Sequence, residues 1–433
     1  MSIVFANSWG WLLDSCSHID EGLQYCMNAF DGHANTRFFK CSFKRHYFDI
    51  SRPHITAKQN TDALTSECLL VTQRSANGEH AKIDLKTRKK RKRKQRDLNT
   101  GELNAHAYHE KIRSVVLEGS QSLVEAGCKC GYLTGGLTVV PSELMPVQEC
   151  QLAALCDMAK QLPLTDDSTA APVQTLNRDD LDAPLDLFSY ITENPYDCAY
   201  EVTLMRERYL LPPRSRFLLS DITRIQPLVN CGDKFDLIVL DPPWENKSVK
   251  RSNRYSSLPS SQLKQLPVRS LAAPGCVVVT WVTNRAQHLR FVREELYPHW
   301  GVEGLAEWLW VKVTCSGEFV FPLDSQHKKP YEVLVLGRYP CSADHTVRSS
   351  TELPEQRLLI SVPSILHSHK PSLSAVLKPY IIHQPKCLEL FARSLQCDWT
   401  SWGNEVIKFQ HSSYFTKETI EEPTSTSDTA HAL

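Results

Sequence analysis

Seven short, continuously apolar runs between about residues 200 and 410 constrain the fold of this chain most strongly. They read RFLLS ending at Ser220, FDLIVL ending at Leu240, CVVVTWV, LWVKVT, EVLVLG, RLLISV and CLELFA. Strands with one face in solvent alternate apolar and polar residues, whereas strands buried on both faces are apolar throughout. A helical pattern at residues 285–295 separates two of the runs. The sequence therefore predicts a doubly wound α/β domain with a mainly parallel sheet, in which ligands bind beyond the carboxyl ends of the strands.

The remaining sequence divides by composition into regions that flank this domain. We expect an N-terminal region of unknown fold at 1–80, a basic disordered linker at 81–100, a mainly helical middle region with a flexible connector at 101–200, the α/β domain at 201–411 and a disordered tail at 412–433. In the middle region one helix is predicted over 101–127, ending at Gly127 as a C-cap. The inward face of this helix would consist of Tyr108, Ile112, Val115, Val116 and Leu123. A second helix is predicted over 147–162, and the connector over 163–186.

Residues 88–96 form an almost unbroken run of lysine and arginine within TRKKRKRKQR. A block of like charges repels itself and stays solvated, so it does not build a core. It can be a nuclear-import signal, a phosphate-binding arm or a solvated linker, and the first two are compatible. We expect a nuclear protein, with the cytosol and the mitochondrion left open.

Composition bounds the partners and the compartment. Lys plus Arg and Asp plus Glu are 49 each, but a zero total does not exclude nucleic acid, since binding depends on where the charge lies. No apolar stretch approaches the roughly 20 residues of a membrane helix, and no secretion signal is expected. Several of the 15 cysteines fall inside apolar runs, as reduced thiols of an intracellular protein do. Neither the Cys128–Cys130 pair nor His367, His369 and Cys387 match a metal-ligand spacing, so no metal is predicted.

The tetrapeptide Asp241-Pro242-Pro243-Trp244 directly follows the FDLIVL run. Two prolines remove two backbone donors and fix the chain path, which leaves carbonyl oxygens available as acceptors. Asp241 adds a carboxylate, and Trp244 offers a wide aromatic face. These groups suit a planar ring bearing an amine, such as adenine, whose amine hydrogens they can accept while the ring stacks. Orientation and preorganised acceptors would then favour attack of the amine nitrogen on an electrophilic methyl group. The alternative is a plain strand-to-loop turn capped by an aromatic residue.

Four segments in one order, FDLIVLDPPW, HSHKP, LELFAR and WTSWGNE, resemble the MT-A70 family of adenine-N6 methyltransferases. The likeness spans about residues 200–410. It implies a permuted Rossmann-like methyltransferase domain, in which the catalytic motif precedes the cofactor-binding LELFAR strand. It also implies S-adenosyl-L-methionine as the methyl donor.

The resemblance assigns roles to individual residues around that donor. Ser220, Asp221 and Ile222 would flank the adenine and amino-acid parts of the cofactor, and Asp241 would contact its ammonium as well as the target amine. Lys370 would reach its carboxylate, and Glu389 would hold its ribose hydroxyls. Arg393, Asn404 and Glu405 would close the pocket. Leu395 and Gln396 stand where a messenger-RNA relative has a His-Asn pair that contacts the cofactor.

Candidate substrate contacts lie in three places. The segment after the DPPW motif combines cations, hydroxyls and an aromatic residue, which suits phosphate contacts and base stacking. The candidates there are Asn246, Lys247, Arg251, Arg254 and Tyr255. Lys328 and Lys329 are a second possible phosphate contact, weighed evenly against a surface turn. Trp281 and Asn284 could line the target pocket, although Trp281 suits a core position equally well; Trp308, Trp310, Trp399 and Trp402 are expected to be packing residues.

These observations favour an enzyme that methylates adenine N6 in nucleic acid. The resemblance points to 2′-O-methyladenosine in a small nuclear RNA as the acceptor, with DNA adenine as the first alternative. A non-catalytic scaffold that binds RNA or a partner methyltransferase is an alternative of another class. We also expect that the chain can act as a monomer, with its N-terminal and middle regions folded back as a substrate platform.

Overall fold

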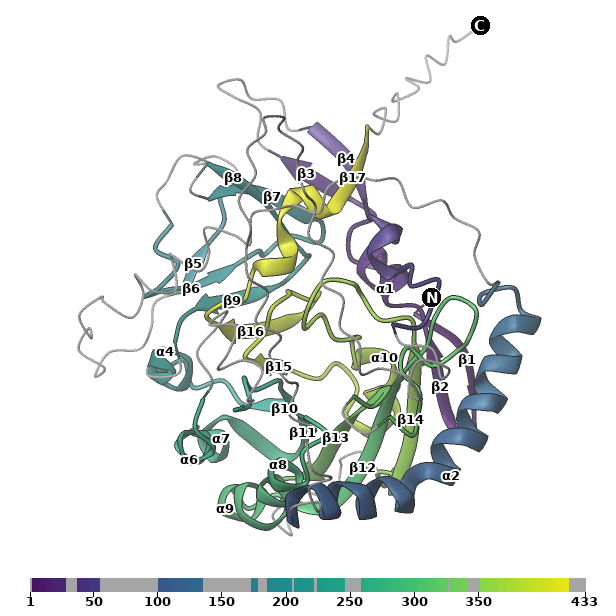
Figure 1. Ribbon diagram of the computed structural model, residues 1–433. Helices are drawn as coiled ribbons and strands as arrows, with labels where there is room; N and C mark the ends of the chain where they lie inside the picture. Colours follow the sequence, from purple (N-terminus) through teal and green to yellow (C-terminus); the bar gives the residue numbers. More distant parts are fainter. Residues whose placement is uncertain are drawn as a thin grey trace, which may run out of the picture.

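Two β-sheets form the framework of the computed structural model of this chain (Figure 1). The structure describes residues 2–28, 37–54, 100–134, 173–177, 185–204, 206–221, 224–245, 258–325, 328–340 and 351–419. The larger sheet contains twelve strands in the order β1, β2, β14, β12, β13, β11, β10, β15, β16, β9, β6, β5. Their bounds in that order are Ile3–Asn7, Gly10–Leu13, Gln356–Ser361, Glu303–Lys312, Tyr331–Arg338, Ala272–Val282, Phe235–Leu240, Cys387–Leu390, Trp399–Gly403, Arg216–Leu219, Ile191–Glu193 and Val173–Thr175.

The centre of the larger sheet is parallel. β11, β10, β15, β16 and β9 are consecutive neighbours, and each pairs in parallel with the next. β13 runs antiparallel between β11 and β12, and β14 and β2 continue in parallel from β12. All seven apolar runs fall in strands, so the prediction of an α/β fold with a mainly parallel sheet is confirmed. β10, which precedes the DPPW turn, pairs in parallel with β15, which comes much later in the chain. Their carboxyl ends therefore meet at one edge of the sheet.

Both faces of the larger sheet are buried at its centre, which explains the unbroken apolar runs. Ile238 and Leu240 of β10 contribute to one hydrophobic core, while Leu237 and Val239 contribute to another. The predicted helix at 285–295 is present as a continuous helical segment with a π-helical turn, formed by α8, η4 and α9. Trp308, Trp310, Trp399 and Trp402 are all buried, as predicted.

The helices of the described residues are α1 (Ser15–Glu21), α2 (Thr100–Lys129), α4 (Gln226–Asn230), α6 (Ser260–Leu263), α7 (Val268–Leu271), α8 (Ala286–Phe291), η4 (Val292–Leu296), α9 (Tyr297–Trp300) and α10 (Ser374–Leu377). The 3-10 turns are η1 (Arg45–Phe48), η5 (Lys378–Tyr380), η6 (Lys408–Gln410) and η7 (Ser412–Tyr414).

The helix predicted over 101–127 is confirmed as α2, which packs along the outside of β1, β2, β14 and β12 (Figure 1). Ile112, Val116 and Leu123 are buried in the core, and Tyr108 and Val115 pack against it. The predicted C-cap is wrong, because α2 continues to Lys129 and Gly127 lies inside it. There a Cβ would come within 2.6 Å of Leu12 Cδ2, so Gly127 serves close packing rather than helix termination. The second predicted helix and the basic run lie outside the described residues.

The N-terminal region joins the larger sheet directly. β2 pairs in parallel with β14, and Gly10 lies against Leu358 at the start of this pairing. A Cβ on Gly10, whose φ is +152°, would lie 1.9 Å from the carbonyl oxygen of Leu358, so only glycine permits this approach. The N-terminal segment Gly10–Leu13 therefore extends the sheet of the α/β domain.

A smaller sheet lies beside the larger one and draws strands from three parts of the chain. Its order is β17, β4, β3, β7, β8, with bounds Phe415–Thr419, Arg37–Phe43, Cys26–Asn28, Ala199–Leu204 and Glu207–Leu211. The predicted disordered tail is wrong for its first residues, because Phe415 is buried and β17 pairs antiparallel with β4. The predicted connector at 163–186 likewise contains a strand, β5. Among the helices of the described ranges, none combines the length and the apolar character that a membrane span requires.

Candidate active site

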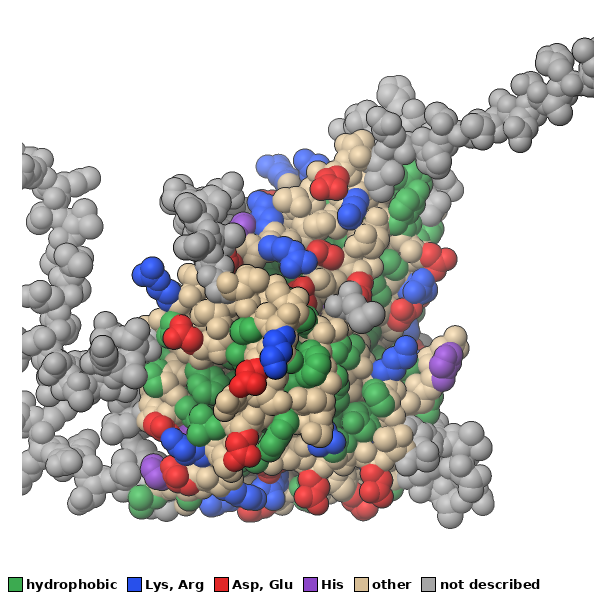
Figure 2. All heavy atoms as spheres, turned by 90° about the vertical axis from the view of Figure 1, so that its right-hand side faces the viewer, with side chains coloured by type: hydrophobic (Ala, Val, Ile, Leu, Met, Phe, Trp, Pro, Cys, Tyr) green, Lys and Arg blue, Asp and Glu red, His purple; other side chains and the backbone are tan. Residues whose placement is uncertain are grey.

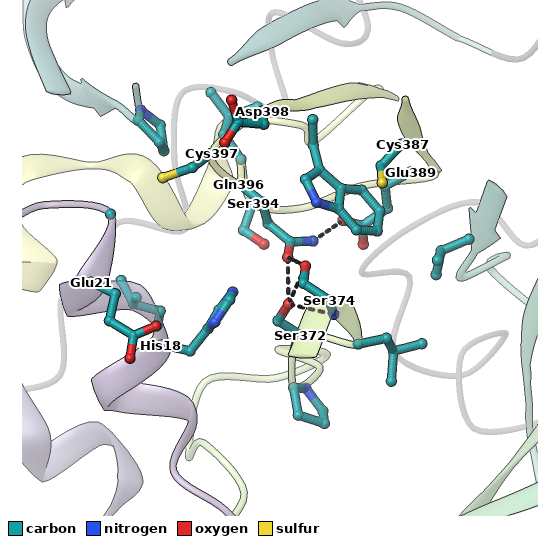
Figure 3. A pocket seen from close by; sticks show the side chains of 18 of the residues that line it. His18, Glu21, Ser372, Ser374, Cys387, Glu389, Ser394, Gln396, Cys397 and Asp398 are labelled. Carbon is teal, nitrogen blue, oxygen red and sulfur yellow. Dashed lines mark hydrogen bonds between the residues drawn. The ribbon is translucent and has the colours of Figure 1, made fainter. Parts of the chain in front are cut away.

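A cavity of about 840 Å³ lies over the larger sheet, next to the carboxyl end of β10. Its sheet wall includes Leu237, Val239 and Asp241, together with Glu389 of β15. The segment 368–374 and helix α1 form other parts of the lining, and Figure 3 shows how their side chains face one another. The cavity thus lies at the edge where parallel strands end, as the fold class predicts.

Asp241 is buried at this edge and lies between two cations. Its backbone N–H donates to the carbonyl oxygen of Leu390, at 3.2 Å, which ties it to the end of β15. Its carboxylate oxygens lie 3.5 Å from Lys370 Nζ and 2.7 Å from Arg393 Nη1. A buried carboxylate held by two cations keeps a fixed position and is ready to accept further donors.

Lys370 connects Asp241 to a second carboxylate, Glu332, whose Oε2 lies 2.9 Å from its Nζ. Burial acts to lower the pKa of Lys370, but Asp241 and Glu332 together outweigh it and hold the pKa above its ordinary value. Burial acts to raise the pKa of Glu332, yet Lys312 and Lys370 hold it well below its usual range. Lys370 is therefore charged, and its ammonium group lies within the cavity lining.

Glu389 is a carboxyl group of the cavity lining whose pKa is raised. Burial raises its pKa to about 7, against a lowering by the hydrogen bond from Gln396 and a further raising by the charge of Asp241. Its Oε2 accepts from Gln396 Nε2 at 3.1 Å. A carboxylate that gains hydroxyl donors from a ligand ionises more readily, so this group can respond to what enters the cavity.

Arg393 links the cavity to the segment that follows β16. Its Nε lies 3.1 Å from Glu405 Oε2, while its Nη1 contacts Asp241. Within the described residues the cavity lining does not include Ser220, Asp221, Asn404 or Glu405. Ser220, at the end of β9, is buried, and its backbone N–H donates to the carbonyl oxygen of Gly403 at the end of β16. These residues therefore form a flank next to the cavity, and Ile222 lies outside the described residues.

The DPPW turn differs from the prediction in two contacts. The carbonyl oxygens of Pro242 and Pro243 are not free, because they accept the N–H groups of Trp244 and Leu258 at 2.8 and 2.9 Å. Each retains a second lone pair. The prediction that Trp244 offers an open ring face is wrong as well. Trp244 is 5% exposed, and its indole stacks on His288 with the ring centroids 4.8 Å apart. The indole Nε1–H donates to the carbonyl oxygen of Trp281. In this structure Trp244 anchors the turn and presents no ring face to the cavity.

The other predicted substrate contacts are spread around the same edge of the sheet. Trp281 lines the cavity, and Lys370 Nζ lies 5.5 Å from the centre of its ring. Asn284 donates to the carbonyl oxygen of Tyr331, and Lys329 donates to that of Leu323, so both have local structural contacts. Lys328 is exposed, with its Nζ 5.3 Å from the ring of Phe321. Asn246, Lys247, Arg251, Arg254 and Tyr255 lie outside the described residues.

Three features of the site were not found from the sequence. Glu332 could have been noticed as a charged residue opening an otherwise apolar strand. Ser372 and Ser374 follow HSHKP and donate to Gln396 Oε1, and nothing in the sequence indicates this contact. Helix α1 brings His18 to the cavity from the N-terminal region, and no local pattern indicates that. The described residues contain no group of three or more His, Cys, Asp or Glu side chains placed to hold a metal ion.

The donor set suits a zwitterionic nucleoside ligand next to an amine acceptor. Lys370 can pair with a ligand carboxylate, Asp241 with an ammonium group, and Glu389 with vicinal hydroxyls. Such an arrangement, on a parallel sheet at the ends of β10 and β15, defines an S-adenosylmethionine-dependent methyltransferase.

Comparison with known proteins identifies the family. Residues 235–405 match the MT-A70 family model. The chain is 48% identical over 393 residues to the N(6)-adenine-specific methyltransferase METTL4 of Mus musculus, covering 87% of this chain and 81% of that protein. It is 34% identical over 216 residues to the N6-methyladenosine RNA methyltransferase MTA1 of Pyricularia oryzae, with 48% of this chain and 56% of that protein covered. It is 35% identical over 215 residues to the DNA N6-methyl methyltransferase of Caenorhabditis elegans, covering 48% and 56%.

The chain belongs to the MT-A70 family. It is an S-adenosylmethionine-dependent adenine-N6 methyltransferase that acts on nucleic acid, as the sequence predicted. The alternative of a non-catalytic scaffold is thereby set aside.

Proposed function

We propose that the acceptor is an adenosine in RNA, and that 2′-O-methyladenosine in a small nuclear RNA is the favoured form. The resemblance of the sequence motifs points to this acceptor, and a relative named as an RNA methyltransferase agrees with RNA as the polymer. DNA adenine is the second candidate, favoured by the relative named as a DNA methyltransferase.

Asp241 is the proposed catalytic residue, with the Pro242 and Pro243 carbonyls as further acceptors. Together they hold the hydrogens of the adenine amine and orient its nitrogen lone pair, because an acceptor favours the pyramidal nitrogen. Trp244 contributes by fixing the turn through its bond to Trp281. Asp241 need not be a strong base, because the nitrogen becomes acidic as it gains its methyl group. When bound, S-adenosylmethionine supplies an electrophilic methyl group at this position.

The proposed cofactor residues are those that carry complementary charge. Lys370 takes the carboxylate, Asp241 the ammonium and Glu389 the ribose hydroxyls, while Arg393 keeps Asp241 in place. Ser220, Asp221, Ile222, Asn404 and Glu405 are proposed to complete the adenine end of the pocket. The observation that carries the proposal is the convergence of Asp241, Lys370 and Glu389 on one cavity.

The nucleic-acid strand is proposed to approach over the loop between β12 and β13. Lys328 is exposed beside Phe321, whose ring lies 5.0 Å from that of His54. Aromatic rings with adjacent cations suit single-stranded bases and phosphates. This loop packs on α2, where Asp324 pairs with Arg113, and the face that includes α2 and β1 mixes acidic and basic side chains among hydrophobic ones (Figure 2). We include Asn246, Lys247, Arg251, Arg254, Tyr255, Trp281, Asn284 and Lys329 in the proposed substrate surface.

Matched oligonucleotides test the acceptor. RNA and DNA of one sequence, each with and without a 2′-O-methyl group on the target adenosine, would be methylated in parallel and analysed by mass spectrometry. We expect the fastest transfer to the 2′-O-methylated RNA. Equal or faster transfer to DNA would overturn the RNA proposal.

We further propose that residues 88–96 direct the protein to the nucleus and that the chain acts as a monomer. Deletion of 88–96 should abolish nuclear accumulation while methylation of short oligonucleotides is largely kept, and unchanged localisation would refute the signal. For the second proposal, β2 and β1 continue the larger sheet beyond β14, and α2 packs on β1, β2 and β14. Light scattering that shows an obligate dimer would refute it.

A further inference from the structure

One wall of the cavity carries a hydrogen-bonded group centred on Gln396, which follows β15 (Figure 3). Gln396 Nε2 donates to Glu389 Oε2 at 3.1 Å. On its other side, Gln396 Oε1 accepts from Ser372 Oγ at 2.5 Å and from Ser374 Oγ at 3.2 Å. The side chain therefore joins the LELFAR strand to the segment that follows Lys370.

The carboxylate of Glu389 determines which way the amide faces. An ionised carboxylate can only accept, so the amide N–H groups turn toward it, and the two serine hydroxyls donate to the amide oxygen on the other side. The N–H of Ser374 donates to Ser372 Oγ at 3.2 Å, which helps to hold the first hydroxyl in place. In this orientation Gln396 donates to Glu389 and stabilises its ionised form, because a donor favours the charged state of a carboxyl group.

Helix α1 approaches the same group from the N-terminal region. The His18 side chain lines the cavity and points toward Gln396 (Figure 3). α1 is itself fixed at both ends: Asp14 accepts from the N–H groups of Cys16 and Ser17 as an N-cap, and Asp20 accepts from the N–H of Phe43 in β4. A residue far outside the segment that matches the family model thus reaches the residues around Glu389.

We propose that Gln396 is a positioning residue that orients Glu389 toward the ribose hydroxyls of S-adenosylmethionine, and that α1, through His18, makes the N-terminal region part of the cofactor pocket. This inference rests on the proposed role of Glu389. Gln396 acts through Glu389, and its removal should weaken cofactor binding while the transfer step is kept.

The charges around Glu389 give this role a measurable signature. Burial holds the pKa of Glu389 near 7, the Gln396 bond lowers it, Asp241 raises it and Arg393 lowers it. His18 faces Gln396 from α1, and burial lowers the pKa of this histidine. Lys370 lies across the cavity on Asp241. Without the Gln396 donor the pKa of Glu389 rises further, so cofactor affinity should be lost at a higher pH than in the wild type.

The test uses the full chain and calorimetric titration with S-adenosylmethionine at several pH values from about 6 to about 9. For Gln396→Leu we expect an affinity about tenfold lower near neutral pH, in line with the loss of one bond to a charged group. The midpoint of the pH dependence should move upward, and kcat at saturating cofactor should stay within about twofold. His18→Ala and the Ser372→Ala/Ser374→Ala double variant should shift the midpoint in the same direction by less.

Gln121→Leu is the matched control, because Gln121 also donates to a glutamate, Glu125, at 3.0 Å but on the exposed surface of α2. It should leave affinity and midpoint unchanged. Glu389→Gln distinguishes a failure of the proposed role of Glu389 from a failure of the proposed role of Gln396. If it binds the cofactor as tightly as the wild type, the proposed role of Glu389 is wrong. If it weakens binding but Gln396→Leu and His18→Ala keep the wild-type affinity and midpoint, the role of Gln396 is wrong. Should Gln396→Leu not fold, Gln396→Asn and His18→Ala give the same readouts.

Discussion

The two sides of Asp241 are built in different ways. On the proposed cofactor side, Lys370, Arg393 and Glu389 are fixed by ion pairs and hydrogen bonds between strand ends. On the proposed acceptor side, Lys328 is exposed on a loop between two strands, and Asn284 and Lys329 bind backbone carbonyl groups. The cofactor is the same small charged molecule in every reaction, so a rigid, charge-paired site suits it. A nucleic-acid strand is larger and contacts a wider surface, so single contacts on that side matter less.

Asp241 belongs to both sides, and its substitution should have the largest effect. Asp241→Asn keeps the size of the side chain but removes the charge and one acceptor. We expect kcat to fall by about 10²–10³, the range for loss of one preorganised electrostatic contact. Single-turnover transfer to the preferred oligonucleotide would measure this at saturating cofactor. A rate within about threefold of the wild type would mean that Asp241 is not the acceptor of the amine hydrogens.

Lys370→Met tests the cofactor side alone. Removing the ammonium group leaves Asp241 and Glu332 without their shared cation, and such truncations of buried pairs cost about 2 kcal/mol. The affinity for S-adenosylmethionine should fall about 30-fold. The corresponding change on the acceptor side, Lys328→Met, should leave that affinity as it is. Equal losses from the two variants would remove the distinction between the sides.

The pH dependence of cofactor binding sharpens the same distinction. Because the pKa of Glu389 lies near 7, the carboxyl group is largely protonated below that pH. Ligand hydroxyls favour the ionised form, lower the pKa and release a proton on binding. Affinity should therefore be full above about pH 8 and fall about tenfold for each pH unit well below 7, until the pKa of the complex is reached. Calorimetry in two buffers with different ionisation enthalpies counts the released proton, and Glu389→Gln should release none.

The smallest effect is expected for Lys328→Ala. Loss of one phosphate contact should raise the KM for RNA about threefold and reduce the salt dependence of binding by about one unit of slope. Cofactor affinity should not change. A variant with the wild-type salt slope would place the strand elsewhere on the protein.

Apolar runs predicted the strands and placed Asp241 at the end of one of them, while the roles of Lys370 and Glu389 came from the family resemblance. The structure brings these three residues to one cavity, whereas Ser220, Asp221, Asn404 and Glu405 are not part of its lining. The face taken by the Trp244 ring was not predictable, since an indole after a strand suits a core as well as a pocket, and here His288 stacks on it. The approach of His18 to Gln396 depends on long-range folding of α1. The same is true of β17, whose Phe415 finds its place only beside β4.

A crystal structure of the protein with S-adenosylhomocysteine tests the central claim most directly. The ligand should lie in the cavity beside Asp241, with its carboxylate on Lys370 and its ribose hydroxyls on Glu389. Density for the ligand at any place that leaves these three side chains without contact would contradict the account.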